Sequence, residues 1–457
     1  MRRYYFIYGI FFIGSLKAQN NNLKPEKAVA IIDTEISSMI REISADSIKT
    51  YILKMVAFKT RHSLSDTSSD SQGIGAARRW VAQKFRQFAL RHQAQMRVEL
   101  DPFHTSPGPR IPYPVTMKNV LGTLKGKDHA DTRIILVSGH LDSRNTNVMD
   151  SAGLAPGAND DASGVAVVLE LARVLSKKKY PCTIIFMAVQ GEEQGLLGAR
   201  HMAGKIKDSG GRLVAMLNND IVGNSLASET GDKNDKAVRV FSEMIPAFET
   251  DDQRAARTAL RSENDSPSRQ LARYIKETAD VYLREFTATL NARPDRFLRG
   301  GDHTPFNQLG FPAVRFTEFN EDFRHQHQDV RKENNIQYGD LPEFVDYKYT
   351  ANVARINLAA IASLAKAPGT PQAVKMKITL GNMTYLTWTA PMAGPKPKGY
   401  YVVMRETYQP FWEKKFFVAD TSAAMPYSKD NYFFAVQSVG QDDHVSQVVM
   451  PVPVREF

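Results

Sequence analysis

The sequence predicts an α/β protein with a mostly parallel sheet covered by helices on both faces, followed by a small all-β sandwich. Three observations support this fold class. Short apolar runs alternate with helical patterns up to residue 366, polar residues follow several of these runs, and short alternating runs replace the helical patterns after residue 372. Buried strands that alternate with helices form parallel sheets, because each crossover helix covers one face of the sheet.

The α/β part is expected to span residues 24–367 and to contain five buried strands. Apolar runs predict these strands at residues 118–124, 133–140, 182–189, 212–220 and 311–318. Apolar residues three and four apart predict helices at residues 45–58, 73–93, 163–178 and 349–366. A polar, charge-rich insertion at about 225–290, with a helical pattern at 268–283, is expected over the edge of the sheet.

A Pro/Gly break at residues 367–372 separates this part from a region with an all-β pattern at residues 373–457. The side chains expected to face one another across its core are Leu386, Trp388, Tyr432, Phe434 and Val436. The Trp in the second strand and the Tyr-x-Phe-x-Val run resemble a fibronectin type III domain. Nothing in this region suggests catalysis, so we expect a spacer or a docking module.

Length, composition and charge fit an ordinary globular protein of two or three units. The 457 residues are 42% hydrophobic and 24% charged, and the formal net charge is +10. Three of the positive charges, Arg2, Arg3 and Lys17, lie in a segment that we expect to be removed, which leaves +7. The other basic residues are scattered among acidic ones, so no nucleic-acid partner is indicated.

The first residues have the pattern of a secretory signal peptide. Two arginines precede an uncharged apolar run, and small residues follow near Ala18. We expect residues 1–18 to be removed and the mature protein to be secreted or periplasmic, without stable membrane insertion; a buried helix or an uncleaved anchor is the alternative. Cys182 is the only cysteine, so no intrachain disulfide can form and the core must hold the fold.

Polar residues that can bind metal ions follow the expected strands. They are His140 and Asp142 in GHLDS, Asp160 and Asp161 in ANDDAS, Glu192 and Glu193 in GEEQG, Asp220 in NNDIV, and His325, His327 and Asp329 in RHQHQD. Ligand sites of open α/β sheets form at the carboxyl ends of strands, where all five groups fall. A lone Asp after a strand is usually a cap or a turn residue, but five such groups at one edge would repel without a cation.

The residue types favour two zinc ions at this edge. Imidazole and carboxylate ligands favour Zn²⁺, with Mn²⁺ or Co²⁺ as substitutes. Two histidines and three carboxylates suit two ions that share one bridging carboxylate. In the adjacent glutamate pair, one member can bind metal while its neighbour takes a proton from the attacking water, which is chemistry suited to amide hydrolysis.

Five motifs in the order GHLDS, GANDDASG, GEEQGLLGA, NNDIVG and GDHTPF resemble the zinc-dependent aminopeptidases of metallopeptidase family 28, clan MH, over roughly residues 45–366. The resemblance implies the zinc exopeptidase fold and two Zn²⁺ per chain. It implies that His140 and Asp220 bind one ion, that Glu193 and a late histidine bind the other, and that Asp160 bridges them.

The resemblance also implies roles for residues around the ligands. Glu192 matches the general base, and Asp142 matches the carboxylate that orients the first histidine. Asp302 and His303 match a motif on the substrate side, or they form a turn that supports the loop. The peptide bond between Asp160 and Asp161 is expected to be cis.

The late histidine has two candidates. In family members it commonly stands four residues before an aspartate, and His325 stands four residues before Asp329, so the spacing prefers His325. His327 is the alternative, because a shift of the loop by one turn would bring it to the metal instead.

These features predict a secreted di-zinc metallopeptidase, most simply an aminopeptidase that releases N-terminal residues. Its partners would be peptides or proteins with a free N-terminus, since the metal site or a nearby carboxylate can hold an amine. One alternative is a transferase like glutaminyl cyclase with one zinc ion, which the full ligand set disfavours. The other is an inactive binding protein on the same fold, which Glu192 argues against.

Overall fold

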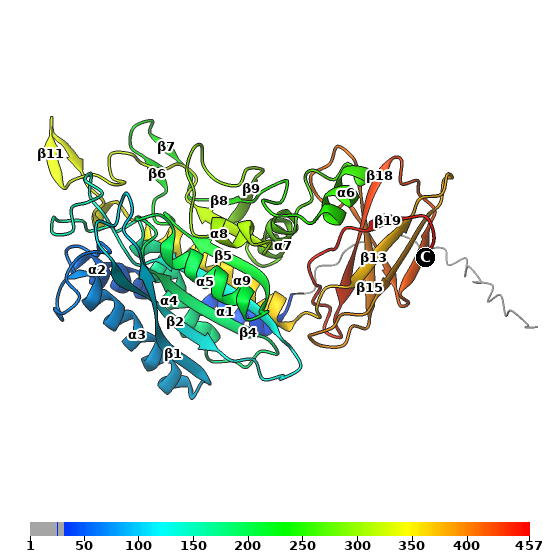
Figure 1. Ribbon diagram of the computed structural model, residues 1–457, viewed down its shortest axis with the longest axis horizontal. Coiled ribbons are helices and arrows are strands. Elements are labelled where there is room, and N and C mark those ends of the chain that lie inside the picture. Colours follow the sequence, from blue (N-terminus) through cyan, green and yellow to red (C-terminus); the bar gives the residue numbers. More distant parts are fainter. Residues whose placement is uncertain (1–24, 26–31) are drawn as a thin grey trace, which may run out of the picture.

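The described residues, Pro25 and residues 32–457 of a computed structural model, form an α/β body and a smaller β body that lie side by side (Figure 1). The β body is built from the C-terminal strands. The signal peptide expected at residues 1–18 lies outside the described residues. Within those residues, no helix has the length and apolar character needed to cross a lipid bilayer.

An eight-stranded sheet forms the centre of the α/β body. In spatial order its strands are β1 (Met96–Thr105), β2 (Val115–Leu124), β4 (Thr183–Val189), β3 (Arg133–His140), β5 (Arg212–Asn219), β10 (Ala313–Thr317), β8 (Ala237–Phe241) and β9 (Thr287–Asn291). The pairs β4–β3, β3–β5, β5–β10 and β8–β9 are parallel, and the other three pairs are antiparallel. The expected mostly parallel sheet is confirmed, with its antiparallel pairs toward the two edges.

The region expected to be an insertion over the sheet edge also extends the sheet. Its elements are a hairpin of β6 (Leu226–Ala227) and β7 (Asp232–Lys233), then β8, α6 (Asp251–Leu260), α7 (Pro267–Tyr282) and β9. Strands β8 and β9, which the sequence pattern did not predict, add two strands next to β10. Both are only five residues long and lie in a polar, charge-rich stretch, so their periodicity is hard to recognise.

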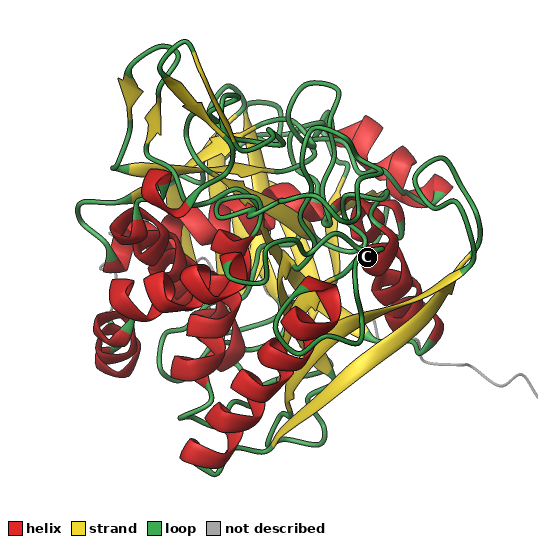
Figure 2. Ribbon diagram, turned by 90° about the vertical axis from the view of Figure 1, so that its left-hand side faces the viewer, coloured by secondary structure: helices red, strands yellow, loops and turns green. Residues whose placement is uncertain are grey.

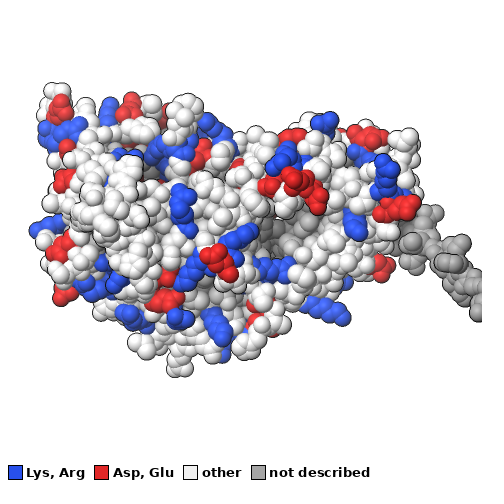
Figure 3. Space-filling model, in the orientation of Figure 1, with Lys and Arg blue, Asp and Glu red and all other residues white. Residues whose placement is uncertain are grey.

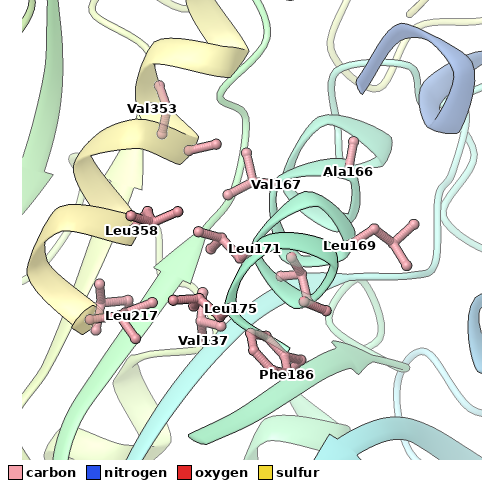
Figure 4. Close-up of a cluster of buried hydrophobic side chains, with 14 of the residues drawn as sticks. Val137, Ala166, Val167, Leu169, Leu171, Leu175, Phe186, Leu217, Val353 and Leu358 are labelled. Carbon is pink, nitrogen blue, oxygen red and sulfur yellow. The ribbon is translucent and has the colours of Figure 1, made fainter. Parts of the chain in front are cut away.

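Helices cover both faces of the sheet, as predicted (Figure 2). The larger apolar cluster includes α1 (Thr34–Glu42), α2 (Ala45–Val56), α3 (Gly73–His92), α4 (Ala162–Leu175), α7 and α9 (Tyr347–Lys366). The smaller cluster, on the other face, includes α5 (Leu197–Asp208) and α8 (Thr304–Gln308). Helix α4 is buried on nearly all sides, because it packs between α9 and the side chains of β3, β4 and β5 (Figure 4). A short 3-10 helix, η1 (Pro342–Phe344), and a hairpin of β11 (Arg331–Glu333) and β12 (Ile336–Tyr338) complete this body.

The β body consists of two small sheets that share one core. One sheet has the order β17 (Ser422–Met425), β14 (Thr384–Thr389), β13 (Gln372–Lys377) and β19 (Val452–Val454). The other has the order β16 (Lys414–Val418), β15 (Gly399–Glu406) and β18 (Tyr432–Val439). Leu386 and Trp388 pack with Phe434 and Val436 in the shared core, as the alternation in the sequence predicts.

A buried group of charges joins the two bodies. Asp265, just before α7, accepts from Arg273 of α7 at 2.7 Å and from Arg405 of β15 at 2.7 Å. We call these three residues the Asp265 cluster; each of their side chains is at most 2% exposed. Trp412 of the β body also donates to the side chain of Gln270 on α7. The β body is therefore fixed on the α/β body by paired, desolvated charges.

Basic and acidic side chains are interspersed on the face of the molecule shown in Figure 3. This distribution agrees with the scatter of charges along the sequence.

Candidate active site

The carboxyl ends of the central strands bring the sequence motifs together. His140 is the last residue of β3, Asp220 directly follows β5, and Glu193 lies in the turn after β4. Asp160 lies just before α4, and its peptide bond to Asp161 is cis, as the resemblance implied. With His327 from the loop before β11, these side chains form one buried group. We call His140, Asp160, Glu193, Asp220 and His327 the Asp160 cluster.

Asp160 stands at the centre of this cluster because its two carboxylate oxygens face different partners. Its Oδ1 lies 2.9 Å from His140 Nε2, which also lies 3.7 Å from Asp220 Oδ1. Its Oδ2 lies 2.9 Å from His327 Nε2, which lies 2.9 Å from Glu193 Oε1. The cluster is thus two groups of three donors, each with ligand atoms within 4.8 Å of one another, that share Asp160.

The electrostatics of the cluster attract positive charge. Burial lowers the pKa of His327, but Glu193 and Asp160 outweigh burial and raise this pKa to about 10. Burial likewise lowers the pKa of His140, while the carboxylates around it raise this pKa well above its ordinary value. Imidazole and carboxylate donors in two compact groups therefore fit divalent cations, and the residue types are those that zinc prefers.

His325, which the spacing preferred, does not join the Asp160 cluster; His327 does. The His325 ring stacks on Phe344, with centroids 3.7 Å apart, and its Nδ1 lies 3.5 Å from Asp322. His327 has a left-handed backbone with φ of 56°, which turns the chain toward Glu193. Gln326, between the two histidines, donates to Asp160 Oδ2 at 3.1 Å. The alternative, His327, is the histidine that the structure places at the cluster.

Asp142 lies beside His140, as the resemblance implied, but its carboxylate has a different task. His140 Nδ1 bonds the backbone carbonyl of Asp142 at 3.0 Å and lies 3.9 Å from the Asp142 carboxylate. That carboxylate accepts the backbone N–H groups of Gly191, Glu192 and Glu193 at 3.1 to 3.3 Å. Asp142 therefore orients the first histidine through its carbonyl and shapes the glutamate turn through its side chain.

Glu192 faces the open side of the cluster. It lines a cavity of about 380 Å³ together with His140, Asp160, Glu193 and Asp220. Burial raises the pKa of Glu192 well above its ordinary value, and the nearby carboxylates of Asp220 and Glu193 add to this effect. A carboxylate with a raised pKa at the wall of a cavity can take up and release a proton near neutral pH.

Neither Asp302 nor His303 is among the described residues that line this cavity. His303 Nε2 bonds the carbonyl of Pro294 at 2.8 Å, so this side chain supports the loop before α8. Asp302 is completely buried, and burial raises its pKa to about 8. Of the two interpretations of this motif, the supporting turn is the one that the geometry favours for His303.

Several supporting residues have no signal in the sequence. Arg315 on β10 forms an ion pair with Asp220 at 2.8 Å, and Arg144 lies 3.2 Å from Glu193. Asp340 accepts the backbone N–H groups of Asn159 and Asp160 at 2.8 and 2.7 Å and so holds Asp160 in place. These residues belong to none of the motifs that the sequence pattern singles out, so only the folded structure reveals their contacts.

The fold and the site together define a metallohydrolase: a helix-covered α/β sheet with a paired donor cluster at its strand ends and a free carboxylate beside it. Residues 119–348 match the sequence profile of Peptidase family M28. The chain belongs to this peptidase family.

Curated relatives and solved structures agree with this assignment. A probable zinc metalloprotease of Leptosphaeria maculans is 45% identical over 92% of this chain and 97% of its own length. One from Pyricularia oryzae is 43% identical over 92% of this chain and 85% of its own length.

Two solved structures show the same fold at low sequence identity. The LapA aminopeptidase of Legionella pneumophila matches with a TM-score of 0.52 and 19% identity, over 77% of this chain and 78% of that chain. An aminopeptidase from Aneurinibacillus sp. strain AM-1 matches with a TM-score of 0.50 and 17% identity, over 72% of this chain and 95% of that chain.

Proposed function

We propose that the protein is an aminopeptidase that uses two zinc ions to release N-terminal residues from peptides. One observation carries this proposal: the two oxygens of Asp160 face separate donor groups, so one carboxylate can serve two ions at once. The printed names of the curated relatives, probable zinc metalloproteases, support zinc as the metal.

Each ion would have its own ligands besides Asp160. His140 and Asp220 would hold the first ion, and Glu193 and His327 would hold the second. Zinc would supply Lewis acidity at this site, because it lowers the pKa of water and polarises a carbonyl group. The surrounding contacts to Arg315, Asp142 and Gln326 would keep the ligands oriented.

Glu192 would move the proton during hydrolysis. It accepts a proton from the attacking water and then gives it to the leaving amine. Its place on the cavity wall and its raised pKa support this role, since a carboxylate with an ordinary pKa is too weak a base to take up a proton efficiently at neutral pH. Asp142 holds Glu192 in place through the backbone N–H at 3.3 Å.

The size and charge of the site support removal of N-terminal residues rather than cleavage within a chain. The cavity of about 380 Å³ suits one residue and the adjoining peptide bond, and its carboxylates can bind a free amine. The two solved structures with this fold are described as aminopeptidases, which supports the same choice.

Two features outside the site are also part of the proposal. We propose export to the periplasm or the medium, on the pattern of residues 1–18. We also propose that residues 373–457 form a docked module of the fibronectin type III kind, supported by its two sheets and shared core.

A panel of aminoacyl 4-nitroanilides with zinc-loaded protein tests the function. We expect release of 4-nitroaniline from free aminoacyl substrates and none from the N-acetylated forms. Cyclisation of an N-terminal glutaminyl peptide without hydrolysis of any other substrate would indicate a transferase instead. Cleavage of the acetylated substrates would contradict the requirement for a free N-terminus.

A further inference from the structure

Four arginines line the cavity above the Asp160 cluster: Arg110, Arg144, Arg296 and Arg299. Four carboxylates line the same cavity, and they belong to Asp160, Glu192, Glu193 and Asp220. The arginines and carboxylates are equal in number, so two bound divalent cations would make the cavity positive. A positive cavity favours substrates that carry a negative group.

Two of the arginines already have carboxylate partners on the side away from the cluster. Glu321 pairs with Arg296 at 2.9 Å and with Arg299 at 2.6 Å. Arg296 also pairs with Asp295 at 3.1 Å. These ion pairs neutralise most of the charge on this wall of the cavity.

The other two arginines are less well neutralised. Arg110 is exposed and donates to the backbone carbonyl of Glu193 at 2.7 Å, and no carboxylate of the described residues lies within ion-pair distance of it. Arg144 Nε forms an ion pair with the Glu193 carboxylate at 3.2 Å, but without the geometry of a hydrogen bond. Both guanidinium groups therefore have donor capacity next to the cavity.

The contact between Arg144 and His327 also indicates that Arg144 has a donor available for another acceptor. Arg144 Nη2 lies 2.8 Å from His327 Nδ1, and an arginine can only donate. A neutral histidine that binds a metal through Nε2 carries its proton on Nδ1, so it cannot accept from Arg144. In the metal-loaded enzyme Arg144 therefore needs another acceptor.

We propose that Arg110 and Arg144 bind a carboxylate of the substrate, so that the enzyme prefers peptides with an acidic group next to the scissile bond. This inference rests on the proposed function. The carboxylate has two possible sources: the side chain of an N-terminal Asp or Glu, or the α-carboxylate of the second residue in a dipeptide. Either would form charge-assisted hydrogen bonds with a guanidinium fork.

Matched substrate pairs test the proposal with zinc-loaded protein. Glu-4-nitroanilide against Gln-4-nitroanilide isolates a side-chain carboxylate, and the dipeptide Leu-Gly against its C-terminal amide isolates the α-carboxylate. We expect the acidic member of one pair to have a kcat/KM at least about tenfold higher, and that pair identifies the source. In the Arg110→Gln/Arg144→Gln double variant, this ratio should fall about tenfold.

Arg299→Gln is the matched control. Arg299 lines the same cavity, but Glu321 already neutralises its charge. The ratio for this variant should stay within about twofold of the wild-type value. Zinc per chain is measured for every variant, since Arg144 touches two proposed ligands. A loss of active enzyme lowers kcat/KM equally for both substrates of a pair, so the ratio of the two values is unaffected by it.

The outcomes separate the two proposals. An active wild-type enzyme without preference in either pair, or a preference that the double variant keeps, would overturn the role of Arg110 and Arg144. Loss of the preference in Arg299→Gln alone would overturn it as well. If the zinc-loaded protein hydrolyses none of these substrates, the proposed function itself fails, and this inference falls with it.

Discussion

The Asp160 cluster and the Asp265 cluster are both groups of charged side chains inside the protein, but the ratio of acidic to basic groups differs between them. In the Asp265 cluster one carboxylate accepts from two guanidiniums at 2.7 Å, and all three side chains are closed off from solvent. In the Asp160 cluster three carboxylates surround two histidines at the wall of a cavity, and they raise the pKa of both.

The difference separates a structural site from a functional one. A buried charge group that is satisfied by its own partners fixes two parts of a protein against each other and needs nothing from solution. The five residues of the Asp160 cluster include more carboxylates than histidines, and the opening of the cluster onto a cavity gives a cation and a substrate access to it. Substitutions at Glu192, Asp265, His327 and Glu243 test this difference.

The largest effect is expected for Glu192→Gln, which changes the chemistry of the Asp160 cluster without removing a proposed ligand. Loss of a general base typically lowers the rate by about 10²–10⁴-fold. Zinc content and thermal stability should match the wild type, because Glu192 is the free member of the pair. Turnover measured at equal zinc content checks this, and activity above a tenth of wild type would exclude the role.

Asp265→Asn should break the structural cluster and leave the site alone. It leaves Arg273 and Arg405 buried without a counter-charge, and breaking a buried pair costs about 3–5 kcal/mol of folding free energy. Urea unfolding measures the loss. Asp251→Asn is the control, because its ion pair with Arg254 is on the surface and should contribute less than about 1 kcal/mol. Equal costs for the two variants would show that the Asp265 cluster is not stabilising.

His327→Ala should remove about half of the bound metal, because one of the two donor groups loses its histidine. His325→Ala is the matched control two residues away and should keep the full zinc content, since that ring stacks on Phe344 instead. Elemental analysis of dialysed protein measures zinc per chain. Depletion in the His325 variant alone would reverse the assignment.

The smallest effect concerns Glu243, a buried carboxylate that has neither an arginine partner nor a cavity among the described residues. Burial raises its pKa to about 7 in the folded protein, above the ordinary value of 4.5. The folded state therefore binds this proton more tightly, so the stabilisation is complete below about pH 4.5 and is lost as the pH rises through 7.

Glu243→Gln should thus raise the free energy of unfolding above pH 7, by about 1–3 kcal/mol, and have little effect at pH 4.5. Thermal unfolding of both proteins at several pH values checks the trend. A variant that is less stable than wild type at pH 8 would show that the ionised Glu243 is favourable in the fold.

Much of the fold could be predicted from local patterns. The five central strands and the long helices α3, α4 and α9 have strong apolar periodicity, so they were expected close to their observed positions. Strands β1, β8 and β9 were not predicted. The five residues of β8 and of β9 lie in a charged stretch and carry too little periodicity to be recognised; β8 pairs with β10, and β9 pairs with β8.

The convergence of His140, Glu193 and Asp220 in one cluster could also be predicted, because the carboxyl ends of parallel strands meet at one edge of the sheet. The late histidine could not, since both candidates lie in one loop whose conformation no sequence pattern determines, and His327 has a left-handed backbone there. The supporting residues Arg144, Arg315 and Asp340 depend on contacts between distant parts of the chain, which a single sequence does not encode in any short motif.

Crystals grown with zinc and measured at the zinc absorption edge test the central claim most directly, because anomalous scattering locates each ion independently of activity. The account predicts two zinc ions that share Asp160, one with His140 and Asp220 and the other with Glu193 and His327. A single ion, or a second ion bound by His325, would contradict it.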